Sequence, residues 1–121
     1  MRALIVDDSR YIRGFLRALL EEYGAECSEA ENGEIALAAL REGNGWDIAF
    51  VDVNMPVMGG LDCVRAIRSD QKMDSLRIMM VTTEADHFFI EAALEAGADE
   101  YLMKPFDAAA LAEKLQIIGM A

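Results

Sequence analysis

Residues 46–60 read WDIAFVDVNMPVMGG and combine a short apolar run with a turn-rich end. The apolar run stops at Asp52, and Asn54, Pro56 and two glycines then turn the chain. This pattern is typical of a buried strand that ends in a carboxylate. In an open parallel sheet helices cover both faces, so side chains at the carboxyl ends of strands reach the crevice where ligands bind. We therefore expect Asp52 to lie at a functional edge of a sheet.

Three other apolar runs end in polar residues that would suit a reactive carboxylate. Asp7 and Asp8 follow the run ALIV, Thr82 follows IMMV, and Lys104 follows YLM. A lone aspartate after a strand more often caps a helix or a turn than carries chemistry. The carboxyl ends of parallel strands meet at one edge, however, so the four runs together predict one site.

Strand-like and helix-like segments alternate along the whole chain. The strand-like segments are 1–7, 25–30, 48–52, 77–82 and 100–103, and segment 25–30 is polar enough for a sheet edge. Helical spacing of apolar residues follows each strand, with Ser9 and Asp107 as predicted N-caps and Gly24 and Gly97 as predicted ends. Five such units predict an α/β fold with a doubly wound parallel sheet and helices on both faces.

The length and net charge of the chain limit the number of domains and the kinds of partner it can bind. The 121 residues suit one domain, which we place at 1–121. The 11 Lys and Arg against 22 Asp and Glu give a net charge of −11, which disfavours direct binding to nucleic acid or to an anionic membrane surface. No window is long and apolar enough for membrane insertion, and the first residues enter a strand without a signal-peptide pattern. We expect a cytoplasmic, stand-alone protein that is a monomer or a weak dimer.

The two cysteines do not suggest a metal site or a disulfide. Cys27 and Cys63 lie far apart in the sequence, without a CxxC pattern or a histidine partner. They fall inside a predicted strand and a predicted helix. Buried, reduced thiols are expected.

Four segments carry a resemblance to a known family. They are IVDDS (5–9), VDVNMPVMGG (51–60), VTTE (81–84) and YLMKPF (101–106). Their order and spacing resemble the receiver domains of two-component response regulators, and within that family the stand-alone chemotaxis CheY type. The resemblance implies a flavodoxin/CheY-like sheet with strand order 2-1-3-4-5.

The acidic residues predict a cation site. Three carboxylates brought together without a counterion would force one of them to bind a proton, so a hard divalent cation is the simplest solution. Mg²⁺ accepts carboxylates, backbone carbonyls, waters and phosphoryl oxygens. The resemblance implies that Asp8, Asp52 and the backbone carbonyl of Asn54 are direct ligands, and that Asp7 acts through water.

The resemblance also assigns roles to the groups around Asp52. Asp52 would be the phosphoacceptor and the nucleophile, and Lys104 and Thr82 would bind the transferred phosphoryl group. Thr82 and Tyr101 would form a switch that responds to phosphorylation. We expect the Lys104–Pro105 peptide to be cis, which would aim the lysine at the acids.

Kinetic properties are expected to depend on Asn54, Thr83 and Glu84. Two positions depart from the family pattern. Gly59 stands where an aspartate is usual, and Thr83 stands where a small residue is usual, so phosphoryl lifetimes cannot be transferred from the family.

The partners implied by the resemblance are proteins. A sensor histidine kinase would be the phosphodonor, and an output protein would bind the face of the fourth helix, fifth strand and fifth helix. Of the adjacent Phe88 and Phe89, only one can face inward, so the other is expected at a binding surface. The sole histidine, His87, is expected at the surface rather than in a phosphorelay.

Two other function classes are weaker. A phosphatase or phosphotransferase with an aspartate nucleophile is superficially similar, but the haloacid dehalogenase pattern fails at Asn54 and the chain has no cap domain. A flavodoxin-like cofactor module would need a Ser-, Thr- or Gly-rich phosphate loop after the first strand, which is missing. We therefore predict a signalling module that catalyses only its own phosphorylation and dephosphorylation, not an enzyme.

Overall fold

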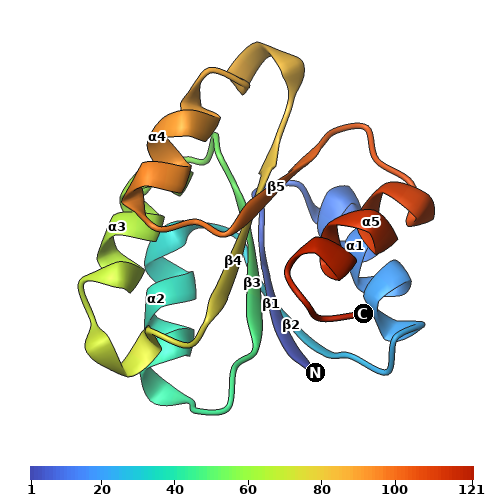
Figure 1. Ribbon diagram of the computed structural model, residues 1–121. Coiled ribbons are helices and arrows are strands. Elements are labelled where there is room, and N and C mark those ends of the chain that lie inside the picture. Colours follow the sequence, from blue (N-terminus) through green and yellow to red (C-terminus); the bar gives the residue numbers. More distant parts are fainter.

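A five-stranded parallel sheet lies at the centre of the computed structural model, which describes residues 1–121 (Figure 1). The strand order is β2-β1-β3-β4-β5, as predicted, and every neighbouring pair is parallel. The strands are β1 (Arg2–Val6), β2 (Glu26–Ala30), β3 (Ile48–Asp52), β4 (Arg77–Thr82) and β5 (Glu100–Met103).

Helices cover both faces of this sheet. Helices α1 and α5 lie on one face, and α2, α3 and α4 lie on the other (Figure 1). Their bounds are α1 (Arg10–Glu21), α2 (Gly33–Glu42), α3 (Gly60–Arg68), α4 (Phe89–Ala96) and α5 (Ala108–Ile117). The doubly wound α/β fold predicted from the sequence is confirmed.

Strand β3 is buried along its whole length because both of its faces are covered. Ile48 and Phe50 belong to the core beneath α1 and α5, whereas Ala49 and Val51 belong to the core beneath α2, α3 and α4. This alternation follows from the period of two residues in a strand. The apolar run therefore ends with Asp52 at the carboxyl edge of the sheet.

Local signals set the helix ends. The side chains of Ser9 and Asp107 accept hydrogen bonds from the third residue after them, as predicted for N-caps. Asn32 caps α2 in the same way. Gly97 ends α4 with a φ of 120°, a conformation that favours glycine.

Two short 3₁₀ turns interrupt the alternation of strands and helices. The polar loop 69–75 contains a 3₁₀ turn, η1 (Gln71–Met73), whose Met73 is buried and contributes to the core. The fourth helix begins only at Phe89, after a 3₁₀ turn, η2 (Glu84–Asp86). His87 therefore precedes the helix, and it is exposed as expected.

Some apolar side chains on the helices are partly exposed to solvent. Phe15, Ile35 and Leu94 are 37%, 43% and 40% exposed. The apolar stripes are wider than the strip of each helix that contacts the sheet, so their margins reach solvent. The ring of Phe15 packs instead between those of Tyr11 and Phe106.

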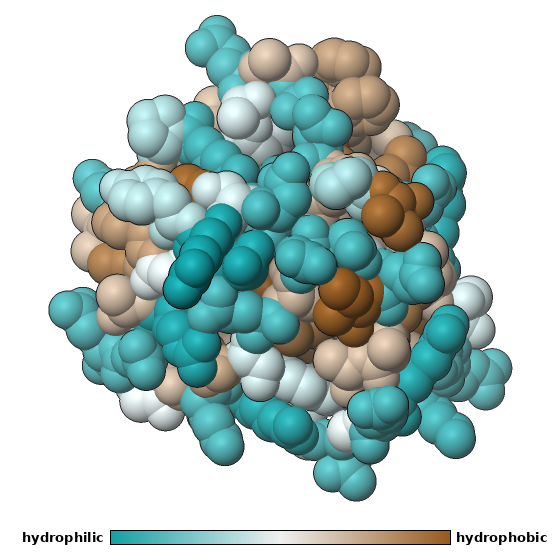
Figure 2. Space-filling view, turned by 180° about the vertical axis from the view of Figure 1, so that it is seen from behind, coloured by the Kyte–Doolittle hydropathy of each residue, from teal (hydrophilic) through white to brown (hydrophobic).

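The face shown in Figure 2 is mostly hydrophilic, with apolar side chains in separate small groups. Cys27 and Cys63 are buried and unpaired, as predicted. None of the helices has the length and apolar character needed to cross a bilayer.

Candidate functional site

The carboxylates of Asp7, Asp8 and Asp52 meet at the carboxyl edge of the sheet, as the strand ends predicted. Each contributes an oxygen to a group in which all such atoms lie within 4.8 Å of one another. Asp7 and Asp52 are buried, with 2% and 6% exposure, and Asp8 is exposed. The cluster therefore has a buried floor and one acid at the solvent side.

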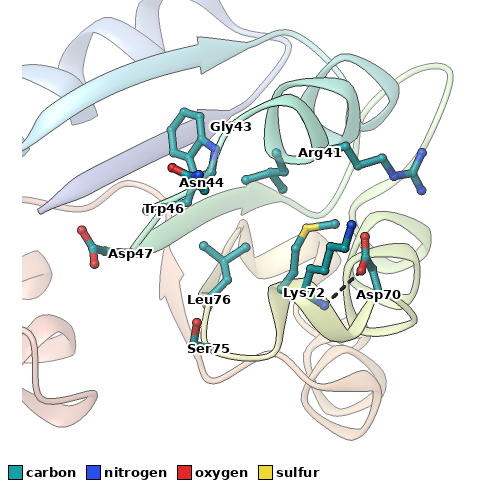
Figure 3. A pocket seen from close by; sticks show the side chains of 12 residues that line it. Arg41, Gly43, Asn44, Trp46, Asp47, Asp70, Lys72, Ser75 and Leu76 are labelled. Atoms are coloured by element: carbon teal, nitrogen blue, oxygen red, sulfur yellow. Dashed lines mark hydrogen bonds between the residues drawn. The ribbon is translucent and has the colours of Figure 1, made fainter.

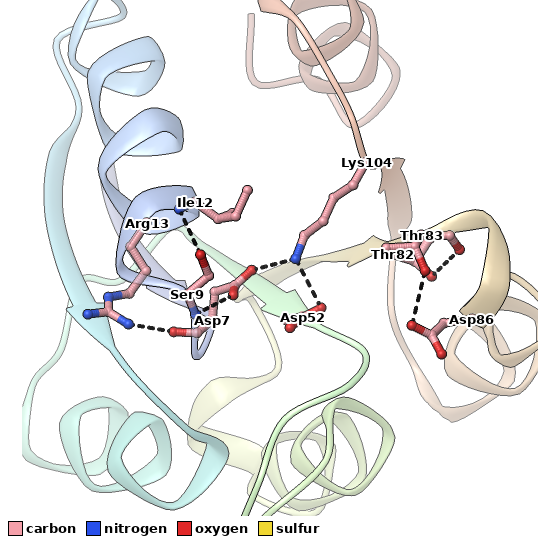
Figure 4. Close-up of polar contacts among 9 residues, drawn as sticks. All are labelled: Asp7, Ser9, Ile12, Arg13, Asp52, Thr82, Thr83, Asp86 and Lys104. Carbon is pink, nitrogen blue, oxygen red and sulfur yellow. Dashed lines mark hydrogen bonds and ion pairs between the residues drawn. The ribbon is translucent and has the colours of Figure 1, made fainter.

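Lys104 extends from the end of β5 into this cluster (Figure 4). Its Nζ donates to Asp7 Oδ2 at 2.9 Å and lies 3.5 Å from Asp52 Oδ1. The Lys104–Pro105 peptide is cis, as predicted. The sequence placed Lys104 near the acids correctly but did not show that Asp7 is its nearer partner.

Burial dominates the electrostatics of Asp52. Removal from water, followed by the charge of Asp7, raises the pKa of this carboxyl to about 6. The ammonium of Lys104 and the backbone of Asn54 act in the opposite direction without cancelling the rise. Burial and the charge of Asp7 therefore favour the protonated form of Asp52 in the protein alone.

The surroundings of Lys104 favour its charged form. Burial alone would lower the pKa of its ammonium, but the hydrogen bond to Asp7 and the charge of Asp52 outweigh that effect. The pKa of Lys104 is raised. The lysine therefore stays protonated and supplies a fixed positive charge beside Asp52.

Asp7 and Asp8 have different surroundings although they are adjacent. Both oxygens of Asp7 accept hydrogen bonds, Oδ1 from the backbone of Ser9 at 2.8 Å and Oδ2 from Lys104. The Asp7 carbonyl accepts from Arg13 at 2.7 Å. The Asp8 carboxylate has no hydrogen bond or ion pair within the protein and is free to bind a cation.

Thr82, the last residue of β4, and Thr83 make no hydrogen bond with Asp7, Asp8 or Asp52. The Thr82 hydroxyl is buried and donates to the Thr83 carbonyl at 3.1 Å, and the Thr83 hydroxyl donates to Asp86 at 3.1 Å (Figure 4). The contact with Asp86 was missed from the sequence, although the spacing of three residues is that of a helix cap. Glu84 lies exposed beside it.

Tyr101 lies on β5, on the face covered by α4. It is half-buried against that core, and the Lys114 ammonium lies 3.9 Å from the centre of its ring. The exposed Asn54 follows Asp52 in the loop after β3. These positions bring the predicted switch and tuning residues around the site without showing what they do.

Gly60, one of the two glycines that the sequence placed in the turn after Asp52, allows this loop to pack closely. A Cβ on Gly60 would lie 2.3 Å from the carbonyl oxygen of Asp52. The first turn of α3 can therefore approach the end of β3 this closely only with glycine. In the sequence, the pair Gly59–Gly60 is the feature that indicates this close approach.

Comparisons with known proteins agree with this geometry. A family model described as the response regulator receiver domain matches residues 3–116. The chemotaxis protein CheY of Pseudomonas aeruginosa is 41% identical over 119 residues, which cover 98% of this chain and 95% of that protein. Chemotaxis protein CheY-3 of Vibrio cholerae is 40% identical over 119 residues, with coverages of 98% and 91%.

Solved structures are similar over nearly the full length. The chemotaxis response regulator CheY4 of Vibrio cholerae has a TM-score of 0.86 at 36% identity and covers 95% of both chains. The response regulator TrrA of Thermotoga maritima, solved in complex with Mg²⁺ and BeF, has a TM-score of 0.82 at 38% identity, with coverages of 95% and 96%. By its sequence match and its fold, the chain belongs to the family of response regulator receiver domains, and it is of the CheY-like kind.

Proposed function

We propose that this receiver domain accepts a phosphoryl group on Asp52 from a sensor histidine kinase and thereby changes its affinity for an output protein. The observation that carries the proposal is the meeting of Asp7, Asp8 and Asp52 with the Lys104 ammonium at one edge of the sheet. The named relatives are chemotaxis proteins, so chemotaxis is the process we propose.

The carboxylate of Asp52 is the nucleophile. One of its oxygens forms a bond to phosphorus while the bond from phosphorus to the donor nitrogen breaks, and the electron pair of that bond leaves with the donor imidazole. The Lys104 ammonium, 3.5 Å from Asp52, is placed to pair with a negative oxygen of the transferred group. Thr82 offers a hydroxyl once it leaves the Thr83 carbonyl.

The residues present fit Mg²⁺. Carboxylate oxygens within 4.8 Å of one another are the hard donors that this ion prefers, and a cation would offset the charge of Asp7 that helps to raise the pKa of Asp52. Asp8, Asp52 and the carbonyl of Asn54 would hold the ion. Both oxygens of Asp7 are already engaged, which suits its proposed role through water. When bound, Mg²⁺ would neutralise negative charge on the phosphoryl oxygens.

The switch we propose links Thr82 to Tyr101. A phosphoryl group on Asp52 gives the Thr82 hydroxyl and Lys104 new hydrogen-bond acceptors that exist only in that state. Movement of Thr82 would alter the space beside Tyr101, because both side chains lie on the α4 side of their neighbouring strands. The output face formed by α4, β5 and α5 would then change.

That face carries the apolar side chains a protein partner needs. Leu94 on α4 and Ile117 on α5 are 40% and 58% exposed. Phe89, which is 38% exposed, lies on the other side of α4, beside Leu61 and Asp62 of α3. Phe88 is more exposed still, at 71%, and its ring lies 4.3 Å from that of Phe89 between centroids. Both phenylalanines, rather than one, are therefore available to a partner.

The chemistry we propose is confined to the protein itself. The receiver catalyses its own phosphorylation and dephosphorylation and has no separate substrate to turn over, so we propose that it is not an enzyme. A cytoplasmic location and a monomeric or weakly dimeric state remain predictions.

Labelling with acetyl phosphate tests the proposal. The protein should incorporate at most one phosphoryl group per chain in the presence of Mg²⁺ and little in the presence of a chelator. Asp52→Asn should abolish labelling, because it removes the nucleophile and keeps the shape of the side chain. Asp74→Asn is the matched control, since Asp74 is an exposed aspartate outside the site.

Two outcomes would count against the proposal. Labelling of Asp52→Asn at the wild-type rate would exclude Asp52 as the acceptor. Repeated turnover of p-nitrophenyl phosphate by the wild type would favour the aspartate-nucleophile hydrolase instead.

A further inference from the structure

A pocket at the opposite edge of the sheet has no part in phosphoryl transfer. It has a volume of about 570 Å³ and lies between the end of α2, the loop that leads into β3, and the segment from η1 into β4 (Figure 3). Pockets of roughly 300 to 1,000 Å³ are the usual size for small organic ligands. Strand β3 separates this pocket from Asp52 by its full length, roughly 16 Å at the rise of an extended chain.

One wall of the pocket is aromatic and its interior is apolar. Trp46 forms the wall, and Leu40, Met73 and Leu76 contribute apolar surface. The Arg2 guanidinium lies 3.9 Å from the centre of a Trp46 ring and holds the indole in place. This combination suits a ligand with a flat or apolar body.

The same tryptophan has an unsatisfied polar atom. Trp46 Nε1 is the one buried side-chain nitrogen or oxygen in the protein without a hydrogen-bond partner. It packs against Gly43, where an added Cβ would lie 2.9 Å away. The indole N–H therefore has no surface exposed to the pocket, and the part of Trp46 that a ligand can contact is its apolar ring.

Two basic side chains line the side of the pocket across from Trp46. Arg41 and Lys72 make no ion pair, although acids outnumber bases by 22 to 11 in the chain and six of the 11 basic residues are paired elsewhere. Two aspartates also line the pocket, and each accepts from a backbone N–H: Asp47 from Arg2 at 2.6 Å, and Asp70 from Lys72 at 3.0 Å rather than from its ammonium. The cationic groups of Arg41 and Lys72 are thus free to bind an acid group.

We propose that this pocket binds a small organic anion whose aromatic or apolar body packs against Trp46 and whose acid group pairs with Lys72 and Arg41. An inorganic anion would leave the apolar surface uncovered. A neutral aromatic molecule would leave both cations unpaired.

Binding of 8-anilinonaphthalene-1-sulfonate to the unphosphorylated protein tests this proposal. N-phenyl-1-naphthylamine, which has the same rings without the sulfonate, is the matched probe. Trp46 is the only tryptophan, so its fluorescence should be quenched by energy transfer to the bound sulfonate probe. Amide resonances of the loop 43–47 and of residues 70–76 should shift, and those of α4 and α5 should not.

Substitution of Lys72 and Arg41 distinguishes recognition of the acid group from non-specific hydrophobic binding of the probe. Lys72→Ala and Arg41→Ala should each weaken binding of the sulfonate probe by about fivefold, the upper range for a partly exposed ion pair. Binding of the neutral probe should not change. Arg10→Ala, which removes an exposed and unpaired arginine of α1, should leave both affinities unaltered. Equal affinity of wild type and both pocket variants for the sulfonate probe, or resonance shifts confined to other surfaces, would overturn the proposal.

Discussion

Lys104 lies closer to Asp7 than to Asp52, with its Nζ 2.9 Å from an oxygen of Asp7 and 3.5 Å from one of Asp52. The lysine therefore acts as an internal counterion for the acids, and it is bound most closely to the acid that is not the proposed nucleophile. A cation at the acids would relieve the same repulsion. Lys104 is then free to turn toward a phosphoryl group on Asp52.

Replacement of the lysine should make the protein depend more on Mg²⁺. Lys104→Met should lower the free energy of unfolding by about 1–3 kcal/mol without Mg²⁺, because buried charged acceptors lose their donor. Excess Mg²⁺ should restore more stability to this variant than it adds to the wild type. Thermal unfolding with and without MgCl₂ measures both effects.

Two variants serve as controls for that experiment. Lys114→Met removes a lysine that pairs with Glu100 at 3.3 Å, away from the acids, and should respond to Mg²⁺ like the wild type. Asp8→Asn removes a proposed ligand and should lose the response. Equal gains from Mg²⁺ in the wild type, Lys104→Met and Asp8→Asn would contradict the account of the site.

The raised pKa of Asp52 predicts a pH dependence of stability without Mg²⁺. Its pKa is about 6 in the folded protein against 3.8 for the free carboxyl, so the folded state favours the protonated form. The stability that this preference contributes is full below pH 3.8 and is lost as the pH rises through about 6. A rise of about two units corresponds to about 3 kcal/mol.

Asp52→Asn keeps a neutral side chain at every pH and isolates this effect. The variant should therefore be more stable than the wild type at pH 8, by up to about 3 kcal/mol, and the difference should shrink toward pH 4. Urea unfolding in a chelating buffer at several pH values measures it. A difference that stays constant with pH would show that Asp52 titrates normally.

The carboxyl edge of the sheet was predictable because each of its polar residues directly follows an apolar run. Asp7, Asp52 and Lys104 met as the sequence indicated. The partner of each hydroxyl was not predictable, since Thr82 and Thr83 bond to groups within one turn of the chain whose positions depend on η2. The strand pattern predicts the backbone position of a residue, but it does not predict which of several nearby hydrogen-bond acceptors its side chain binds.

The pocket beside Trp46 could not be read from the sequence. Its walls come from the end of α2 and from two loops that only the folded sheet brings together. The glycines at 43 and 45 around a lone tryptophan were the only local signal. Similarly, only the packed structure shows that the apolar residue Leu94 of α4 is 40% exposed.

Gly60 should be the least replaceable glycine of the site. Gly60→Ala should lower the free energy of unfolding by about 1–3 kcal/mol, because the new methyl group would collide with the Asp52 carbonyl and backbone must move. Gly14→Ala has nothing within 4 Å of the new group and lies inside α1, so it should add about 0.5–1 kcal/mol. Urea unfolding compares the two. An unchanged free energy of unfolding in Gly60→Ala would mean that the loop can move to accommodate the methyl group at no cost.

The Thr82 hydroxyl should couple phosphorylation to partner binding. Coupling between sites is typically about 1–3 kcal/mol, so phosphorylation of the wild type should change partner affinity about 5- to 150-fold. Thr82→Ala should still accept phosphate and lose most of this change, whereas Thr82→Ser, which keeps the hydroxyl, should retain it. Titration of the phosphorylated proteins with the output partner measures the affinities. If phosphorylated Thr82→Ala bound the partner as tightly as the phosphorylated wild type, the coupling would not depend on the Thr82 hydroxyl.

The position of the phosphoryl group is the most direct test of the central claim. The protein can be labelled with acetyl phosphate and Mg²⁺, the acyl phosphate reduced with borohydride, and the modified residue identified by peptide mass spectrometry. We predict a single modified position, Asp52, in the peptide that follows β3. Modification at Asp7 or Asp8, or a label that resists borohydride and maps to His87, would contradict the account.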